Sequence, residues 1–328
     1  MVVPAYDAER YVGASLRSLQ EQTLPSWRCV VVDDGSRDGT AAIVQAVADG
    51  DQRVRLVRQP NAGPAAARSR GLAELPADVG LVGFLDSDDT LTADALAALA
   101  KSLAARPDAV GVFGVAELMD EQGRPVRAGV HPDRQRARLA IRGRRLVPLD
   151  RGADTTFADL VVWGPIWPSA VGLHRRHVLE EVGGFDPSFP MQEDWELYLR
   201  MSRRGPFAFL DRQVAWYRRH GANLTERHLD NQLQRERLLH AAWTFPDNTL
   251  RQRRDVAAAW RAVEARHVLH AANRARRAAI ERHLRDAAVS VRAAGVSAAQ
   301  LVRPGPPPAS ASRVRLTRRA EPSGRPLV

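Results

Sequence analysis

The chain has 328 residues, of which 45% are apolar, enough to form the core of one large α/β domain or two smaller ones. This composition excludes a disordered protein. The sequence has no apolar run of 18 residues and its first residues lack the pattern of a signal peptide, so we expect no transmembrane segment and a cytoplasmic location. The single cysteine, Cys29, excludes an internal disulfide and a cysteine-based zinc cluster, and its apolar surroundings predict a buried thiol.

The net charge of +10 is of the kind that favours a nucleic-acid or anionic-membrane partner, because clustered cations bind phosphates with release of counterions. However, Lys101 is the only lysine, and the abundance of arginine and alanine indicates a genome-wide codon bias. The excess charge also concentrates after residue 250, away from the motifs described below. We therefore expect no nucleic-acid partner.

Short β-branched runs alternate with helix-periodic segments in the first half of the chain, which is typical of a doubly wound α/β fold. The expected strands are residues 2–5, 28–33, 54–57 and 81–85. The expected helices lie within residues 8–22, after a cap at Asp38 or Thr40, at 64–75 and at 92–103. The first strand is shorter than the usual ~5–6 residues, which suggests that the true start lies upstream.

The second half of the chain has fewer clear patterns. Residues 118–162 contain Gly, Pro and many Arg without periodicity, which predicts loops that cover a site. From Glu226 to about Ala299 the sequence predicts two or three amphipathic helices, with Trp260, Val263 and Val268 on their apolar side. Residues 303–328 have the composition of a disordered tail.

Acidic residues follow two of the predicted strands. Asp33 and Asp34 end the second strand and precede Gly35. In an open parallel sheet the carboxyl ends of the strands face the ligand crevice, so a carboxylate there can accept hydrogen bonds from a base or a ribose. A turn rich in Asp and Gly is equally common in an ordinary loop, so this run alone does not decide between the two.

The second acidic run is Asp86-Ser87-Asp88-Asp89, after the apolar strand at 81–85. In extended chain the carboxylates of Asp86 and Asp88 point to the same side and can address one ligand together. Mg²⁺ or Mn²⁺ is typically held by one or two carboxylates plus substrate phosphates, which suits a nucleoside diphosphate. Helix capping by Asp88 or Thr90 accounts for one of these acids but hardly for all three.

Glu193 and Asp194 form a third acidic pair, at the start of a predicted helix. Ordinary complementation of the helix dipole is the plain interpretation of such a pair.

Four motifs, in their order and spacing, resemble those of glycosyltransferase family 2. They are Val3-Pro4-Ala5-Tyr6-Asp7-Ala8, Val32-Asp33-Asp34-Gly35-Ser36-Arg37-Asp38-Gly39-Thr40, Asn61-Ala62-Gly63-Pro64-Ala65-Ala66-Ala67-Arg68-Ser69-Arg70-Gly71 and Asp86-Ser87-Asp88-Asp89. The similarity covers about residues 1–222. It implies the GT-A fold, a doubly wound nucleotide-binding mixed sheet flanked by helices. Asp7 departs from the pattern, because relatives usually carry asparagine there.

The resemblance also implies a division of the chain. Residues 1–225 would form the GT-A domain, with a nucleotide-sugar-binding half at 1–115 and an acceptor and catalytic half at 116–225. Residues 226–302 would be a helical C-terminal extension, followed by the tail at 303–328.

The resemblance implies six donor-binding residues: Pro4, Ala5, Tyr6, Asp34, Arg68 and Asp86. Ala5 and Tyr6 match positions that line the base pocket, and Asp34 matches the aspartate that reads the base. Arg68 matches a basic residue that contacts the base or the phosphates, and Asp86 matches the acid near the ribose.

The resemblance further implies a metal site and a catalytic pair. Asp88 matches the metal-binding acid, for Mn²⁺ or Mg²⁺. The segment ending at His220 resembles a closing segment of many relatives, in which His220 could reach the metal or the diphosphate, although an isolated histidine is as often structural. Asp194 matches the general base for the acceptor hydroxyl, and Glu193 helps to place the acceptor or the base.

The resemblance therefore implies a metal-dependent hexosyltransferase. Because it implies one base and no protein nucleophile, we expect inversion at the anomeric carbon. A UDP-sugar is the favoured donor, and the acceptor would be a saccharide or a lipid-linked sugar in cell-envelope polysaccharide or glycolipid synthesis.

Two alternatives stay open. A nucleotidyltransferase shares the α/β fold and the acidic metal ligands, but it would need a glycine-rich basic loop where residues 5–13 offer Asp7, Glu9 and only Gly13. A non-catalytic protein could use the basic C-terminal helices on polyanions or on a membrane surface. In the enzyme, the same helices are compatible with peripheral contact at the inner face of the plasma membrane, although packing against the catalytic domain or a partner is the plainer interpretation.

Overall fold

The computed structural model describes residues 1–126, 135–136, 138–142, 145–164, 166–189, 191–221, 223 and 228–280. The chain divides into two compact units, Met1–Glu226 and Arg227–Val328.

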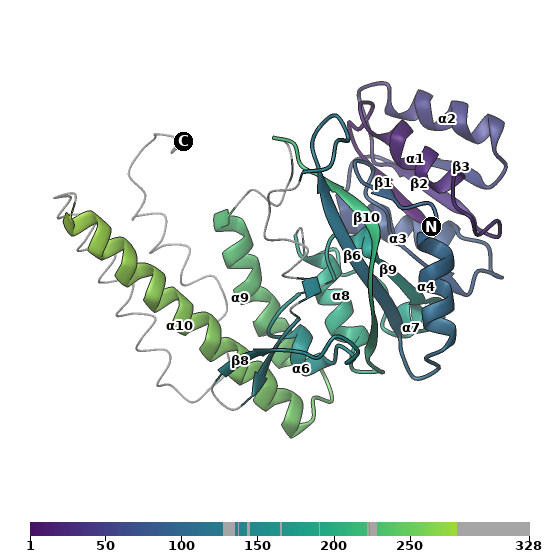
Figure 1. Cartoon of the computed structure of the whole chain (residues 1–328). Helices are drawn as coiled ribbons and strands as arrows, with labels where there is room; N and C mark the ends of the chain where they lie inside the picture. Colours follow the sequence, from purple (N-terminus) through teal and green to yellow (C-terminus); the bar gives the residue numbers. More distant parts are fainter. Residues whose placement is uncertain are drawn as a thin grey trace. The chain divides into compact units, whose positions relative to one another are not determined.

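The first unit begins with a three-stranded parallel sheet in the order β1-β2-β3 (Figure 1). Its strands are β1 (Val2–Ala5), β2 (Cys29–Asp33) and β3 (Val54–Arg58). Strand β2 is buried along its whole length, because it is apolar up to Asp33. Ala5 pairs with Asp33, so β1 and β2 end at the same edge of the sheet.

Two helices connect these strands, α1 (Val12–Gln20) and α2 (Thr40–Gly50), and α3 (Pro64–Glu74) follows β3. Right-handed crossovers place α1 and α2 together, while α3 crosses back and packs on β1 and β2 from the other side (Figure 1). Asp38 Oδ1 accepts a hydrogen bond from the Thr40 N–H at 3.0 Å at the start of α2. The strands and helices that sequence periodicity predicted in this region are confirmed.

A five-stranded mixed sheet follows, in the order β4-β9-β6-β10-β5. Its strands are β4 (Leu81–Val82), β5 (Thr90–Leu91), β6 (Gly111–Met119), β9 (Gly172–Arg175) and β10 (Phe207–Arg218). Strand β10 runs parallel to β6 and antiparallel to β5. The predicted strand at 81–85 has two parts: β4 pairs with β9, and the chain then pairs with β1, since Leu85 N donates to Val2 O at 3.0 Å.

The structure also describes in this unit the helices α4 (Ala95–Ala104), α6 (Phe157–Leu160), α7 (Arg176–Glu181) and α8 (Glu193–Met201), with a 3-10 turn at Ser169–Val171. Strands β7 (Leu139–Arg142) and β8 (Arg145–Pro148) form a hairpin. This hairpin, α6 and the end of β6 lie in the stretch that we expected to be loops at 118–162, so that expectation is wrong in part. The strands there are short, and arginines obscure their periodicity.

A cluster of aromatic side chains links Phe84, two residues before Asp86, to helix α8. Phe84 packs edge-on against Phe185 at 4.9 Å between ring centroids, and His174 lies 5.0 Å from the ring of Tyr198. Burial lowers the pKa of His174 to about 3, so the imidazole is neutral at physiological pH. The cluster gives the segment that carries Asp86 and the helix that carries Asp194 a common rigid support.

Cys29 is buried, as the sequence predicted, and burial raises the pKa of its thiol to about 11. It is therefore a neutral apolar side chain within β2.

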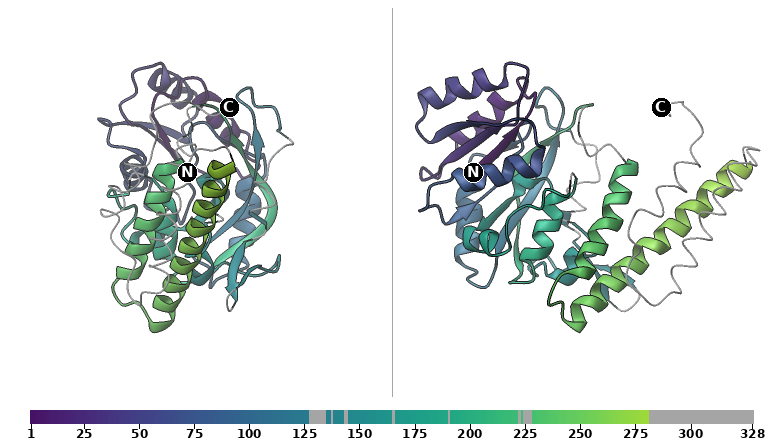
Figure 2. Two further views of the ribbon diagram at one scale, coloured as in Figure 1. Left: turned by 90° about the vertical axis from the view of Figure 1, so that its left-hand side faces the viewer. Right: turned by 180° about the vertical axis from the view of Figure 1, so that it is seen from behind.

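The second unit contains α9 (His228–Thr244) and α10 (Leu250–Ile280), which contact each other (Figure 2). Trp260 and Val263 are buried, as their predicted place on an apolar side requires. The side chain of Val268 and all of residues 281–328, including the predicted tail at 303–328, lie outside the described residues. Among the helices that the structure describes, none combines the length and the apolar character needed to span a bilayer.

Candidate active site

The acids at the end of β2 shape the loops around them. Asp34 is 3% exposed. Its Oδ1 accepts hydrogen bonds from Gln59 Nε2 at 2.8 Å and Ala62 N at 2.9 Å, and its Oδ2 accepts one from Gly63 N at 2.8 Å. Asp34 thereby fixes the loop that opens α3. A carboxylate oxygen can accept two bonds, so Oδ2 keeps one lone pair for a base N–H, as the predicted role requires.

The end of β1 lies beside Asp34. Ala5 is buried, and its carbonyl accepts a hydrogen bond from Asp34 N at 2.8 Å. Tyr6, which follows Pro4 and Ala5, is 46% exposed although it is a large aromatic residue. Its ring is therefore accessible to a flat ligand such as a nucleobase.

Arg68 connects three separate parts of the chain. This residue of α3 is 5% exposed, and its Nη2 donates to Asp86 Oδ1 at 2.6 Å while its Nη1 donates to Glu193 at the start of α8. Burial alone would lower the pKa of Arg68, but the charges of Asp86 and Glu193 raise it above its ordinary value. Arg68 is thus a permanent buried cation between two predicted site carboxylates, a role that the sequence patterns did not indicate.

Asp194 lies next to this bridge in the first turn of α8. Burial, followed by the charge of Glu193, raises the pKa of Asp194 to about 7, and the charge of Arg68 opposes this rise. Ser169 Oγ donates to Asp194 Oδ2 at 3.3 Å, and Trp195 Nε1 donates to Leu160 O at 2.8 Å and so anchors the start of α8. A carboxylate that titrates near neutral pH suits general-base catalysis. Ser169 is a contact that the sequence did not reveal.

Asp88 and His220 meet although 132 residues separate them. His220 Nε2 lies 2.9 Å from Asp88 Oδ2, and both side chains are largely buried. The chain turns at Ser87 and Asp88, since Asp89 N donates to Asp86 O at 3.1 Å. The expectation of extended chain at 86–88 is therefore wrong: Asp86 faces Arg68, while Asp88 faces His220.

A carboxylate and an imidazole form a donor set that Mn²⁺ accepts. Within the described residues no three His, Cys, Asp or Glu side chains gather in a way that could hold a metal ion. Among the described residues Asp88 and His220 thus offer two donors, and diphosphate oxygens would have to complete the coordination. This arrangement fits a nucleotide-bound metal and does not fit a site built from protein ligands alone.

The mixed sheet flanked by helices, with its acids at the strand ends, is the α/β architecture of the GT-A glycosyltransferases. Two solved structures share it. The mannosyltransferase PcManGT from Pyrobaculum calidifontis, in complex with GDP-Man and Mn²⁺, is 17% identical with a TM-score of 0.60, covering 97% of this chain and 79% of that one. S. aureus TarS 1-349 in complex with UDP-GlcNAc is 16% identical with a TM-score of 0.54, covering 88% of this chain and 89% of that one.

Residues 1–152, slightly less than half of the chain, match the family described as Glycosyl transferase family 2. Over 132 residues it is 33% identical to the "Putative teichuronic acid biosynthesis glycosyltransferase TuaG" of Bacillus subtilis, covering 40% of this chain and 51% of the relative. Over 98 residues it is 40% identical to the "Succinoglycan biosynthesis protein ExoW" of Rhizobium meliloti, covering 29% of this chain and 31% of the relative. The chain thus matches about half or less of the length of these relatives.

Proposed function

We propose that this protein is an inverting glycosyltransferase that moves a sugar from a nucleoside-diphosphate sugar to an acceptor hydroxyl in cell-envelope polysaccharide synthesis. The observation that carries the proposal is the Arg68 bridge, which holds the donor-side acid Asp86 beside the pair Glu193 and Asp194. Asp86 also interacts electrostatically with both Asp194 and Asp89. These contacts support the proposal that the predicted donor residue Asp86 and the predicted base Asp194 act in one site.

In the proposed reaction, the acceptor oxygen attacks the anomeric carbon as the bond from that carbon to the diphosphate oxygen breaks. The electron pair of the broken bond leaves with the diphosphate, and the acceptor proton passes to the Asp194 carboxylate. A positioned base of this kind typically contributes ~10²–10⁴-fold in rate. One displacement without a protein nucleophile inverts the configuration at the anomeric carbon.

The other residues bind and orient. Tyr6 and Asp34 would hold the base, and Asp86 would lie at the ribose. Glu193, fixed by Arg68, would orient the acceptor next to Asp194. Asp88 and His220 would hold Mn²⁺ or Mg²⁺, which when bound supplies a Lewis acid for the charge on the leaving diphosphate.

The proposal assigns donor binding to residues 1–115 and acceptor binding with catalysis to residues 116–225. A UDP-hexose is the donor to test before others, and a saccharide or lipid-linked sugar is the proposed acceptor. The relatives named for teichuronic acid and succinoglycan synthesis support an envelope polysaccharide as the product. Exposed arginines at the start of α10, Arg251, Arg253 and Arg254, would support peripheral contact with an anionic membrane surface on its cytoplasmic side.

The loop after β1 argues against a nucleotidyltransferase. Asp7 Oδ1 accepts a hydrogen bond from Arg37 N at 2.8 Å, and Glu9 Oε2 accepts one from Gly39 N at 2.7 Å. The N–H groups of residues 7–9 are themselves bonded, to Ser36 Oγ at 3.0 Å, Thr40 Oγ1 at 2.7 Å and Asp38 Oδ2 at 3.0 Å, whereas a phosphate-binding loop would present free N–H groups.

The test is a calorimetric titration of UDP, GDP and dTDP, each with Mn²⁺ and with EDTA. We expect at least one diphosphate to bind more tightly with Mn²⁺, and Asp88→Asn to remove this gain. Asp108→Asn is the matched control, because Asp108 is an exposed acid paired with Arg106. Failure of every diphosphate to bind would refute the proposed function.

A further inference from the structure

Arg218, the last residue of β10, is an arginine whose side chain is buried at the metal side of the site, with 5% of the residue exposed. Its Nε donates to the carbonyl of Asp88 at 2.8 Å. Its Nη1 donates to the carbonyls of Asp120 at 3.3 Å and Glu121 at 3.2 Å, in the turn that follows β6. One guanidinium therefore connects the Asp88 turn to a second loop.

A second hydrogen bond joins the Asp88 turn to Arg218, this time between the Arg218 backbone and a side chain of the turn. The backbone N–H of Arg218 donates to Asp89 Oδ1 at 2.9 Å, and Asp89 is fully buried. The guanidinium thus binds the carbonyl of Asp88 while the carboxylate of the next residue binds the Arg218 backbone. These reciprocal bonds close a ring that leaves the turn little freedom to move relative to the end of β10.

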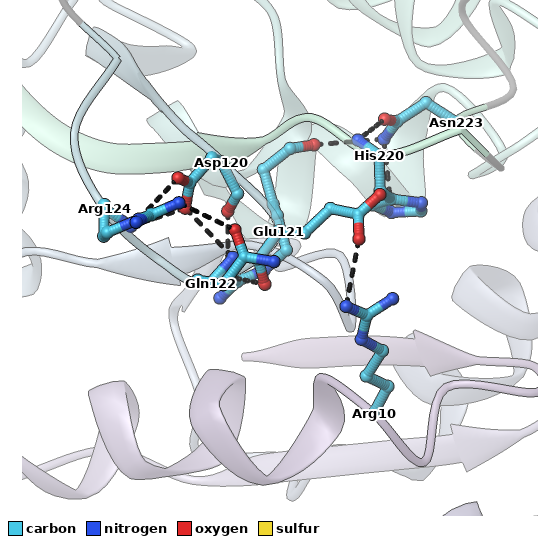
Figure 3. Close-up of polar contacts among 8 residues, drawn as sticks. Arg10, Asp120, Glu121, Gln122, Arg124, His220 and Asn223 are labelled. Carbon is cyan, nitrogen blue, oxygen red and sulfur yellow. Dashed lines mark hydrogen bonds and ion pairs between the residues drawn. The ribbon is translucent and has the colours of Figure 1, made fainter.

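Arg218 also supports His220, the second proposed metal ligand. The Arg218 carbonyl accepts a hydrogen bond from Asn223 Nδ2 at 3.1 Å, and Asn223 Oδ1 accepts one from His220 N at 2.6 Å (Figure 3). The guanidinium carbon lies 4.9 Å from the ring centroid of Tyr11, and the same ring stacks on the His220 imidazole at 5.0 Å. Both proposed metal ligands, Asp88 and His220, are therefore held in place by Arg218 and its direct neighbours.

The type of side chain matters here. A guanidinium presents five N–H donors in a flat, rigid fork, so it can reach the carbonyls of two loops at once. A lysine ammonium is a single point at the end of a flexible stem and cannot hold the same spread of acceptors. Arg218→Lys therefore preserves the positive charge and removes the geometry.

We propose that Arg218 is a positioning residue that fixes the Asp88 carboxylate and the His220 imidazole at the spacing a diphosphate-bound divalent cation needs. The inference rests on the proposed function, and it goes beyond it by assigning a role to a residue that is not among the predicted site residues. Groups that orient metal ligands typically change metal affinity by about 10–100-fold when they are replaced.

The experiment compares Arg218→Lys with Arg175→Lys. Arg175 is a matched control, because it also binds three backbone carbonyls, at Ala109, Leu103 and Arg106, and none of them belongs to the proposed site. For each protein, calorimetry with UDP and with GDP gives the factor by which Mn²⁺ tightens binding relative to EDTA. Thermal melts report the stability of each variant.

We expect Arg218→Lys to reduce the Mn²⁺ factor about 10–100-fold and to leave binding in EDTA within about twofold. Arg175→Lys should lower the melting temperature to a similar degree and keep the Mn²⁺ factor. Binding in EDTA also shows that a variant is folded, and Arg218→Gln serves as a second variant if the lysine variant does not fold.

An unchanged Mn²⁺ factor in Arg218→Lys would overturn the inference alone, as would an equal loss in both variants, which would indicate general destabilisation. If Mn²⁺ tightens neither diphosphate in the unmodified protein, the proposed metal site fails and the inference fails with it.

Discussion

Replacing Asp194 by asparagine should inactivate the protein and stabilise it at the same time. Asparagine has nearly the same shape as aspartate but cannot accept the proton of the acceptor hydroxyl. Loss of a general base predicts a fall in kcat of ~10²–10⁴-fold, with little change in the affinity for the donor. The unmodified protein should lose activity as the pH falls below about 7, where Asp194 becomes protonated.

The stability effect follows from the same pKa. Burial raises the pKa of Asp194 from 3.8 to about 7, so the folded protein binds this proton more tightly than the unfolded chain does. Stability is therefore lost as the pH rises from about 4 to about 7, while the asparagine variant does not titrate. One pKa unit corresponds to about 1.4 kcal/mol, so between pH 5 and pH 8 the advantage of the variant grows by at most about 3 kcal/mol. Partial exposure of Asp194 reduces this growth to about 1–2 kcal/mol.

The assay is a pair of thermal melts at pH 5 and pH 8 for both proteins. At about 2–4 °C per kcal/mol for a chain of this size, the gap in melting temperature should widen by several degrees at the higher pH. Parallel behaviour of the two proteins across this range would show that Asp194 titrates as an ordinary surface carboxylate. Retention of activity in the variant would remove it as the base.

Arg68→Met should cost about 3–5 kcal/mol of unfolding free energy in a urea titration, because it leaves the buried carboxylate of Glu193 and the partly exposed carboxylate of Asp86 without their cation. Adding Glu193→Gln should recover part of that loss, and a cost below about 1 kcal/mol would contradict the bridge. Tyr6→Ala should weaken nucleoside diphosphate binding by about 1–3 kcal/mol, the range for stacking on an aromatic ring, while leaving the melting temperature nearly unchanged because the ring is exposed. Unchanged affinity in that variant would show that the base lies elsewhere.

The sequence predicted those parts of the fold and site that local patterns specify. The apolar run that begins at Cys29 indicates a buried strand, and β2 is found there. The same periodicity located α3 and, through the strand ends, the acids at 33–34 and 86–89. These features depend on residues that are close together in the chain.

The rest depends on contacts between distant residues. Arg68 and Glu193 are 125 residues apart, and Asp88 and His220 are 132 apart, so no local pattern encodes their pairing. The carbonyl contacts of Arg218 involve backbone atoms, which every residue has, and leave no signature in the sequence. The turn at Ser87 and Asp88 was missed because it depends on how the chain passes from the segment at 84–85, which pairs with β1, to β5, and not on residue type alone.

The central claim is that Asp88 and His220 hold a metal-bound nucleoside diphosphate beside the Arg68 bridge. Anomalous diffraction at the manganese edge, from crystals grown with Mn²⁺ and the diphosphate that binds in calorimetry, tests it most directly. The account predicts a manganese peak within coordination distance of Asp88 Oδ2 and His220 Nε2, in contact with the diphosphate. A diphosphate bound without that peak, or a peak away from both side chains, would contradict it.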